Sequence, residues 1–381
     1  YNPAGTGREM MEGDQLAIEE NPGGEHVSEE IVDRAIEYLK KGFEKAPGQP
    51  VFLYLAFGAA HAPIQVPRSY IDKYAGIYEK GWDRLREERF ARQKQLGIIP
   101  VNAVLTEEHE DDPAWKDLNP VEKTVYARFM ATYAGFIEHT DEQIGKLIQF
   151  LEDAGQYENT LIFLMSDNGA APEAGVDGNF TRPYGTDISV EEMLYRLEDL
   201  GTEQSSALYQ RPWARLGGVP FQKYKLWPYG GGVRDPLIIT WPEQIKDKGG
   251  IRTQFVEVMD ITPTVLDILD IEPPESIGGV KQIPFHGASI LQTFHDPDAP
   301  DPRSTQFFCM RGNRAIYHKG WKAVAIHKRG TDYAEDIREL YLVEIEFSED
   351  IDVSDQHPDI LHELIKIWWE EAEMYGSLTL P

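Results

Sequence analysis

The sequence predicts an α/β fold, a mostly parallel sheet flanked by helices, followed by a small C-terminal α+β subdomain that carries an antiparallel sheet. Helical patterns alternate with short apolar runs at residues 51–56 and 161–165, and these runs lack the alternation of a half-exposed strand. From residue 305 the pattern changes to short β-rich segments separated by glycine. We therefore expect two units, residues 1–303 and 304–381.

Composition excludes several classes of protein. The 381 residues carry 65 acidic and 37 basic side chains, a net charge of −28, which repels nucleic acid and anionic membrane surfaces. No apolar run approaches the roughly 18 residues of a membrane span. The single cysteine, Cys309, excludes an intramolecular disulfide and a cysteine zinc cage, and we expect it to be a buried small residue.

Helical patterns precede each of the first two apolar runs. Ser28 is the predicted N-cap of the first helix, ahead of an apolar face at helical spacing. Residues 70–96 form a charged amphipathic segment that follows the run at 51–56. Asn119 begins the longest helix, with proline at the first helical position, and Gly155 closes it.

The middle of the chain is mostly turn and loop. Residues 170–222 have little periodicity, and a loop of this length usually has a functional or mobile role. A short strand is predicted at 236–240, a helix at 262–269 and a proline-rich connection at 273–302. Three aromatic residues could stack against a ligand at the rim of a pocket, although each is better explained as a loop anchor: Tyr184, Trp213 and Trp227.

The C-terminal subdomain is predicted to hold four antiparallel strands and a final helix. The strands are expected at residues 307–310, 314–317, 322–326 and 339–343, with glycines in three of the connections. The helix is expected from about 358 to 375.

Asp167 and Asn168 stand where the apolar run 161–165 ends. In open α/β sheets, ligands bind just beyond the carboxyl ends of the strands. Carboxylate and amide oxygens suit calcium or magnesium better than zinc. Taken alone, an Asp-Asn-Gly sequence is a common turn, so a metal site needs support from the rest of the chain.

Two basic residues give that support. His61 follows the run at 51–56; it is either hydrogen-bonded at a strand end or acts as a proton donor or anion ligand. Lys225 lies among aromatic residues before a glycine run, where it either extends to solvent or pairs with an anion. The glycine run, 229–232, lacks the helix start and spacing of a phosphate-binding loop.

Together these stretches resemble the sulfatase family of the alkaline-phosphatase-like superfamily, and most of all its arylsulfatase branch. The resemblance covers most of the chain except roughly residues 171–206, and its motifs follow the family's order. The motifs are Phe52-Leu53-Tyr54-Leu55-Ala56 with residues 61–67, residues 81–89 with 96–100, Ser166-Asp167-Asn168-Gly169, and residues 231–238, 258–264, 312–316 and 320–322.

The resemblance implies calcium-dependent hydrolysis of a sulfate ester of a small molecule or carbohydrate, in the periplasm or outside the cell. It implies that Asp167 and Asn168 bind the calcium, which polarises a sulfate oxygen. It also implies that His61 and Lys225 contact the sulfate, with histidine protonating the leaving oxygen and lysine neutralising charge. The resemblance favours calcium over magnesium, and the amide oxygen of Asn168 suits calcium.

The chain departs from the family where the nucleophile should be. The family uses a formylglycine made within a Cys/Ser-x-Pro-x-Arg motif, and this motif is absent here, as are an aspartate pair and a Gly-Lys-x-His segment. We expect them in an N-terminal segment of the same protein, upstream of Tyr1, so that residues 1–303 are an incomplete domain and the chain alone is inactive.

Two other hypotheses stay open. One is a non-catalytic sulfatase-like binding module. The other is a phosphatase or phosphodiesterase of the same superfamily, against which Asn168 argues because the zinc phosphatases prefer histidine beside the aspartate. The sequence indicates neither the particular ester nor the oligomeric state.

Overall fold

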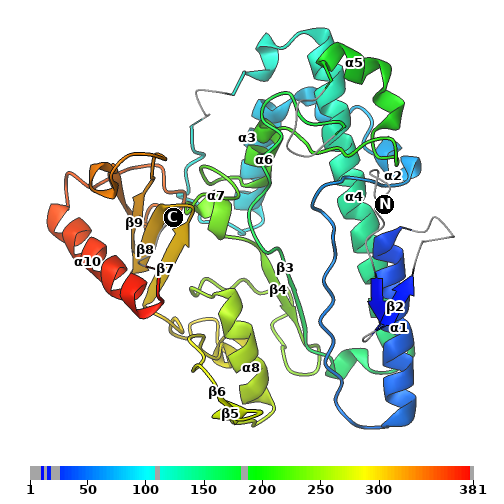
Figure 1. Ribbon diagram of the computed structural model, residues 1–381, viewed down its shortest axis with the longest axis vertical. Coiled ribbons are helices and arrows are strands. Elements are labelled where there is room, and N and C mark those ends of the chain that lie inside the picture. Colours follow the sequence, from blue (N-terminus) through cyan, green and yellow to red (C-terminus); the bar gives the residue numbers. More distant parts are fainter. Residues whose placement is uncertain (1–9, 13–14, 19–25, 108–111, 182–187, 378–381) are drawn as a thin grey trace.

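The computed structural model describes residues 10–12, 15–18, 26–107, 112–181 and 188–377. The long helix α4 (Pro120–Asp153) and α1 (Val27–Lys45) stand side by side on the right of Figure 1, and the C-terminal sheet with its helix lies on the left. A two-stranded pair lies between them. Within the described ranges, no helix is both long and apolar enough to cross a membrane.

Helix α4 organises the helical half of the molecule. Its start is confirmed as predicted: the Asn119 side chain accepts the N–H of Val121 at 2.8 Å, and the Glu122 carboxylate accepts the N–H of Asn119 at 2.7 Å. Helices α1, α2 (Arg68–Asp72) and α5 (Val190–Tyr195) pack against it. The largest core lies on this side and includes Ile64, Ile71, Trp82, Trp115, Tyr126, Phe129, Phe180, Leu200 and Trp213.

Helix α1 begins earlier than predicted. His26, rather than Ser28, is its N-cap: the ring Nδ1 accepts the N–H of Ser28 at 3.1 Å. The other ring nitrogen, Nε2, hydrogen-bonds the carbonyl of Gln65 at 2.8 Å. The imidazole therefore caps the helix and ties it to a distant segment, while Ser28 is buried in the first turn.

The single helical segment predicted at 70–96 is divided into α2, a 3-10 turn (Tyr78–Lys80) and α3 (Trp82–Gln95). The division falls at Gly81, whose φ is +84°, in the left-handed region. A Cβ at this position would lie 2.1 Å from Cγ of Trp115. The indole thus occupies the space that any other side chain would need, and the helix restarts after the glycine.

The central pair joins β3 (Ile162–Met165) to β4 (Leu237–Thr240). The pairing is antiparallel, with Phe163 opposite Ile239, so the parallel neighbour that we predicted for β3 is not found within the described residues. Burial on both faces was also wrong, because Leu164 is 41% exposed and Ile238 is 59% exposed. An apolar strand is buried only where neighbours cover it, and among the described residues β3 pairs with β4 alone.

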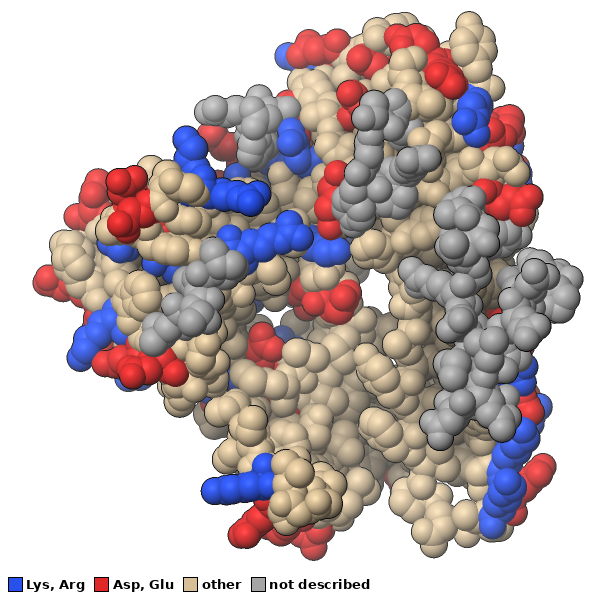
Figure 2. All heavy atoms as spheres, in the orientation of Figure 1, with Lys and Arg blue, Asp and Glu red and all other residues tan. Residues whose placement is uncertain are grey.

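The strand predicted at 51–56 is likewise not formed. This segment is extended chain without strand pairing, and Phe52 and Tyr54 are 80% and 81% exposed. Figure 2, in the same orientation as Figure 1, shows openings through the molecule beside the central β3–β4 pair. The two apolar segments therefore face open space rather than a closed sheet.

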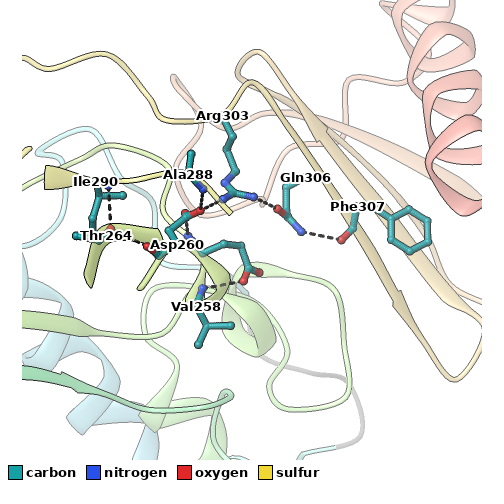
Figure 3. A network of polar contacts seen from close by, with 9 residues as sticks. Val258, Asp260, Thr264, Ala288, Ile290, Arg303, Gln306 and Phe307 are labelled. Carbon is teal, nitrogen blue, oxygen red and sulfur yellow. Dashed lines mark hydrogen bonds and ion pairs between the residues drawn. The ribbon is translucent and has the colours of Figure 1, made fainter. Parts of the chain in front are cut away.

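Asp260 connects the middle of the chain to the start of the C-terminal subdomain (Figure 3). Its buried carboxylate accepts the N–H of Ala288 and that of Glu257, each at 2.8 Å, and pairs with Arg303. Its own carbonyl accepts the hydroxyl of Thr264 at 2.6 Å, at the start of α8 (Ile261–Ile268). Asp260, which belongs to the 258–264 motif, therefore has a structural role: it holds together the start of α8, the segment of Ala288 and Arg303.

The four strands predicted for the C-terminal sheet are confirmed. Its order is β10-β9-β8-β7, antiparallel throughout, and α10 (Pro358–Met374) covers one face. Ile316, Leu340 and Trp368 form the core between sheet and helix. Strand β7 begins two residues after Arg303, next to the boundary that we predicted between residues 303 and 304. The strands are β7 (Thr305–Met310), β8 (Asn313–His318), β9 (Trp321–Ala325) and β10 (Arg338–Leu342).

The remaining elements are short. Near the N-terminus, two short strands pair in antiparallel fashion. The short strands and helices are β1 (Met10–Glu12), β2 (Gln15–Ile18), β5 (Ser276–Ile277), β6 (Val280–Lys281), α6 (Arg211–Gly217), α7 (Gly230–Val233) and α9 (Leu291–His295). Further 3-10 turns span Trp115–Asp117, Tyr157–Asn159, Leu197–Asp199, Val258–Asp260 and Tyr333–Glu335.

Candidate active site

Asp167 and Asn168 follow the end of β3, as predicted, with Ser166 between the strand and Asp167. The turn is held by the Ser166 hydroxyl, which donates to the carbonyl of Asn168 at 2.9 Å. The Asn168 amide donates to the carbonyl of Gly169 at 3.1 Å, so its NH₂ group is engaged within the turn. Asp167 is exposed and Asn168 half-buried. A carboxylate oxygen and an amide oxygen are thus presented at the end of the strand.

Gly169 brings a second segment against this turn. Its N–H donates to the carbonyl of Gly232 in α7 at 3.2 Å. A Cβ at Gly169 would lie 1.9 Å from the carbonyl oxygen of Gly231. Only glycine allows the two backbones to approach this closely.

Lys225 lies beside the same turn. Its backbone N–H donates to the carbonyl of Ala170 at 3.1 Å. Its ammonium lies 3.2 Å from Oε1 of Glu173, and the two side chains are 18% and 13% exposed. The structure therefore joins the segment of Lys225 to the turn of Asp167 and Asn168, and it pairs the lysine with a carboxylate that we did not predict.

The glycine run does not form an anion cradle. The N–H of Gly230 donates to Oε2 of Glu349 at 2.9 Å, and that of Gly231 donates to the carbonyl of Gln222 at 3.2 Å. Gly232 donates to the carbonyl of Tyr229 at 2.9 Å. All three amides are therefore committed within the protein, and the run instead forms the short helix α7.

Asp235 is a neighbour of Asp167 that the sequence did not indicate. Pairing of Met165 with Leu237 places Asp235 opposite Asp167 when the register is continued by two residues. Burial, and then the charge of Asp167, raise the pKa of Asp235 to about 7. A divalent cation between two such carboxylates would relieve their repulsion. Only knowledge of the antiparallel pairing would have revealed this residue.

His61 is exposed at the end of the extended segment. Its Nδ1 lies 2.9 Å from the carbonyl of Ala62, so this nitrogen carries the hydrogen and donates. The residues that follow are fixed, because the N–H of Ile64 donates to the carbonyl of Ala207 at 3.0 Å. Among the described residues, no hydrogen bond or ion pair joins His61 to Asp167, Asn168 or Lys225.

The oxygen donors at the end of β3 suit a hard cation, but they are fewer than such an ion takes. Asp167, Asn168 and Asp235 offer oxygens, which calcium and magnesium prefer. Calcium takes roughly six to eight oxygen ligands. The part of the chain that the structure describes contains no group of three or more His, Cys, Asp or Glu side chains placed to hold a metal. The oxygens of these three residues fit part of a calcium site.

The other residues singled out in the sequence lie at different depths in the molecule. Trp213 lies in α6 and is fully buried, and its indole N–H donates to the carbonyl of Tyr126 at 3.0 Å, so its ring is part of the core. Trp227 is half-buried, with the Lys223 ammonium 5.1 Å from its ring centroid. Tyr184 lies outside the described residues. Cys309 is half-buried on β7, and burial raises the pKa of its thiol.

Oxygen donors after a strand, with a lysine beside them, are compatible with metal-assisted hydrolysis of anionic esters. The family model for sulfatases matches residues 4–271, and the chain belongs to the sulfatase family. Its fold is that of the alkaline-phosphatase-like superfamily, as predicted.

Two curated relatives are similar to much of the chain. An uncharacterized sulfatase of Schizosaccharomyces pombe is 33% identical over 359 residues, which is 92% of this chain and 62% of the relative. The arylsulfatase of Klebsiella aerogenes is 32% identical over 243 residues, 64% of this chain and 51% of the relative. The chain thus spans half to three-fifths of the length of these relatives.

Among solved structures, the crystal structure of Ps i-CgsB in complex with k-i-k-neocarrahexaose is similar in fold. It aligns with a TM-score of 0.56 at 19% identity, over 91% of this chain and 55% of that one.

Proposed function

We propose that this protein hydrolyses sulfate esters with the help of calcium, and that the 381-residue chain supplies part of the active site. The observation that carries the proposal is the hydrogen bond from Lys225 to Ala170, which holds a lysine beside the Asp167-Asn168 turn. Membership of the sulfatase family supports the choice of reaction.

In this proposal, each residue has a distinct role. Asp167 and Asn168 bind calcium through their oxygens; the bound ion would supply charge to polarise a sulfate oxygen. The Lys225 ammonium pairs with the negative charge of the ester. His61 donates a proton to the leaving oxygen, because a departing alkoxide or phenoxide has to be neutralised.

We further propose that another segment of the same protein supplies the nucleophile, a formylglycine, and the missing calcium ligands. Two observations support this. The apolar residues of segment 51–56 and of β3 are exposed beside openings in the molecule, where strands would cover them (Figure 2). The chain also spans only 62% and 51% of the two relatives described above.

The substrate class that we propose is a sulfate ester of a small molecule or a carbohydrate. A periplasmic or extracellular location is part of the proposal and rests on family habit alone. An exposed anionic surface, from 65 acidic residues against 37 basic ones, makes a local cation at the site all the more necessary for an anionic substrate.

Turnover of 4-nitrophenyl sulfate by the full-length gene product tests the proposal. We expect activity with calcium, loss of activity with a chelator, and recovery when calcium is restored. The Lys225→Met variant should lose at least about 100-fold in kcat/KM, the scale of removing one electrostatic stabiliser. Binding of sulfated ligands without turnover would favour the binding-module hypothesis, and faster turnover of the matching phosphate ester would favour a phosphatase.

A further inference from the structure

Glu173 forms an ion pair with Lys225 inside the candidate active site. Its Oε1 lies 3.2 Å from the Lys225 ammonium, and both side chains are more than four-fifths buried. Its second oxygen, Oε2, is buried and accepts no hydrogen bond among the described residues. A purely structural carboxylate would normally have both oxygens satisfied, because an unpaired buried oxygen is costly.

The loop that carries Glu173 is fixed at both ends. At its start, the carbonyl of Ala170 accepts the N–H of Lys225 at 3.1 Å. At its far end, the carbonyl of Gly175 accepts the N–H of Arg211 at 2.7 Å, and the N–H of Gly175 donates to the carbonyl of Pro172 at 3.0 Å. The carboxylate is therefore held at the lysine by the backbone on either side of it.

A fixed carboxylate at this place changes the charge that an incoming ester meets. Lys225 alone would present one positive charge, whereas the pair is neutral overall. In a largely desolvated position this difference is felt more strongly than in water. An ester bound at Lys225 is therefore attracted by the ammonium and repelled by the neighbouring carboxylate.

We propose that Glu173 is a specificity-determining residue that favours monoanionic sulfate esters over dianionic phosphate monoesters. The inference rests on the proposed function and deepens it. A sulfate monoester carries one negative charge. A phosphate monoester, with a second pKa of about 6, carries two at pH 8. Coulomb repulsion scales with charge, so the Glu173 carboxylate penalises the phosphate ester twice as heavily.

The test compares two esters on the same enzyme. The full-length gene product, with calcium, is assayed at pH 8 on 4-nitrophenyl sulfate and 4-nitrophenyl phosphate, and the ratio of the two kcat/KM values is taken. This ratio is independent of the folded fraction, so a partly destabilised variant still gives a valid measure of the preference between the two esters. For Glu173→Gln we expect the ratio of sulfate to phosphate to fall about tenfold, as one screened unit charge a few ångströms away is removed.

Three further variants make the result specific to charge. Glu173→Met replaces the carboxylate by an apolar side chain of similar length and should lower the ratio in the same way. This variant provides the test if Glu173→Gln does not fold. Glu173→Asp keeps the charge and should stay within about twofold of the wild type. Glu158→Gln, at an exposed glutamate in the 3-10 turn before β3, should leave the ratio unchanged.

The outcomes separate the two claims. Wild-type turnover of the sulfate ester, with an unchanged ratio in both Glu173→Gln and Glu173→Met, would overturn the role of Glu173 and leave the proposed function standing. If the wild type turns over neither ester, the proposed function fails, and calorimetric titration with the same two esters supplies the ratio as dissociation constants. Failure of the wild type to bind either ester would overturn both claims.

Discussion

The backbone N–H of Lys225 donates to the carbonyl of Ala170 at 3.1 Å. Ala170 lies three residues after Asp167 in the sequence. A second hydrogen bond joins the N–H of Gly169 to the carbonyl of Gly232, at 3.2 Å. The turn after β3 and the segment of the lysine are therefore one unit, although more than 50 residues separate them in sequence. Any change that forces the two apart should disturb metal and anion binding together.

Gly169→Ala tests this close approach. The new Cβ would lie 1.9 Å from the carbonyl oxygen of Gly231, so the two backbones must separate. We expect kcat/KM of the full-length gene product on an aryl sulfate to fall about 100-fold, the cost of a displacement of about 1 Å in a catalytic site.

Gly145→Ala is the matched control. Gly145 lies in α4, and nothing lies within 4 Å of the position that an added methyl group would occupy. Alanine there should leave activity unchanged and stabilise the protein by about 0.5–1 kcal/mol in urea unfolding. Activity of the Gly169→Ala variant within twofold of the wild type would contradict the close packing described above.

The buried pair of Lys322 and Glu349 supports α7 from the C-terminal subdomain. The ammonium lies 2.7 Å from Oε1, the side chains are 6% and 5% exposed, and Oε2 accepts the N–H of Gly230. Removal of one partner leaves the other charge buried. We therefore expect Lys322→Met to cost about 3–5 kcal/mol of unfolding free energy, measured by urea denaturation.

A surface pair provides the comparison. Lys366 lies 3.5 Å from Glu370 on α10, with side chains 77% and 62% exposed. Lys366→Met should cost less than about 1 kcal/mol, because water and salt screen this pair. Equal losses of unfolding free energy for the two substitutions would contradict the burial of the Lys322–Glu349 pair.

The N-cap of α1 should make the protein sensitive to acid. Burial lowers the pKa of His26 below its ordinary value of 6.5, and its Nδ1 accepts a hydrogen bond only when unprotonated. The unfolded chain then binds more protons than the folded chain just below pH 6.5. Stability is therefore complete above this pH and is lost as pH falls through the lowered pKa.

His26→Asn separates this effect from other titrations. Asparagine is a good N-cap acceptor at any pH, so the variant should lose less stability on acidification. Between pH 7 and 5 we expect a difference on the order of 1 kcal/mol, the worth of one cap, in urea unfolding. Identical pH profiles for the wild type and the variant would rule His26 out as the sensitive group.

Local signals in the sequence predicted the elements that depend on local chemistry. Asn119 and Pro120 define the start of α4 through a capping box, and the glycine-separated β segments after residue 305 define the C-terminal sheet. The turn of Asp167 and Asn168 after β3 was predicted because polar residues follow an apolar run. Each of these signals lies within a few residues of the feature that it predicts.

Features that depend on distant partners could not be predicted. The antiparallel pairing of β3 with β4, and with it Asp235 beside Asp167, is set by residues more than 60 positions apart. The break at Gly81 depends on the indole of Trp115, and Glu173 pairs with Lys225 across a long loop. Periodicity and capping contain no information about such contacts.

Calcium titration of the full-length gene product, wild type against Asp167→Ala, tests the central claim most directly. We predict one tight site in the wild type by isothermal calorimetry, and a loss of at least about 100-fold in affinity in the variant, because a direct ligand is removed. Asp141→Ala, at an exposed aspartate of α4, should bind calcium as the wild type does. Undiminished calcium affinity in the Asp167→Ala variant would contradict the assignment of this turn as the metal site.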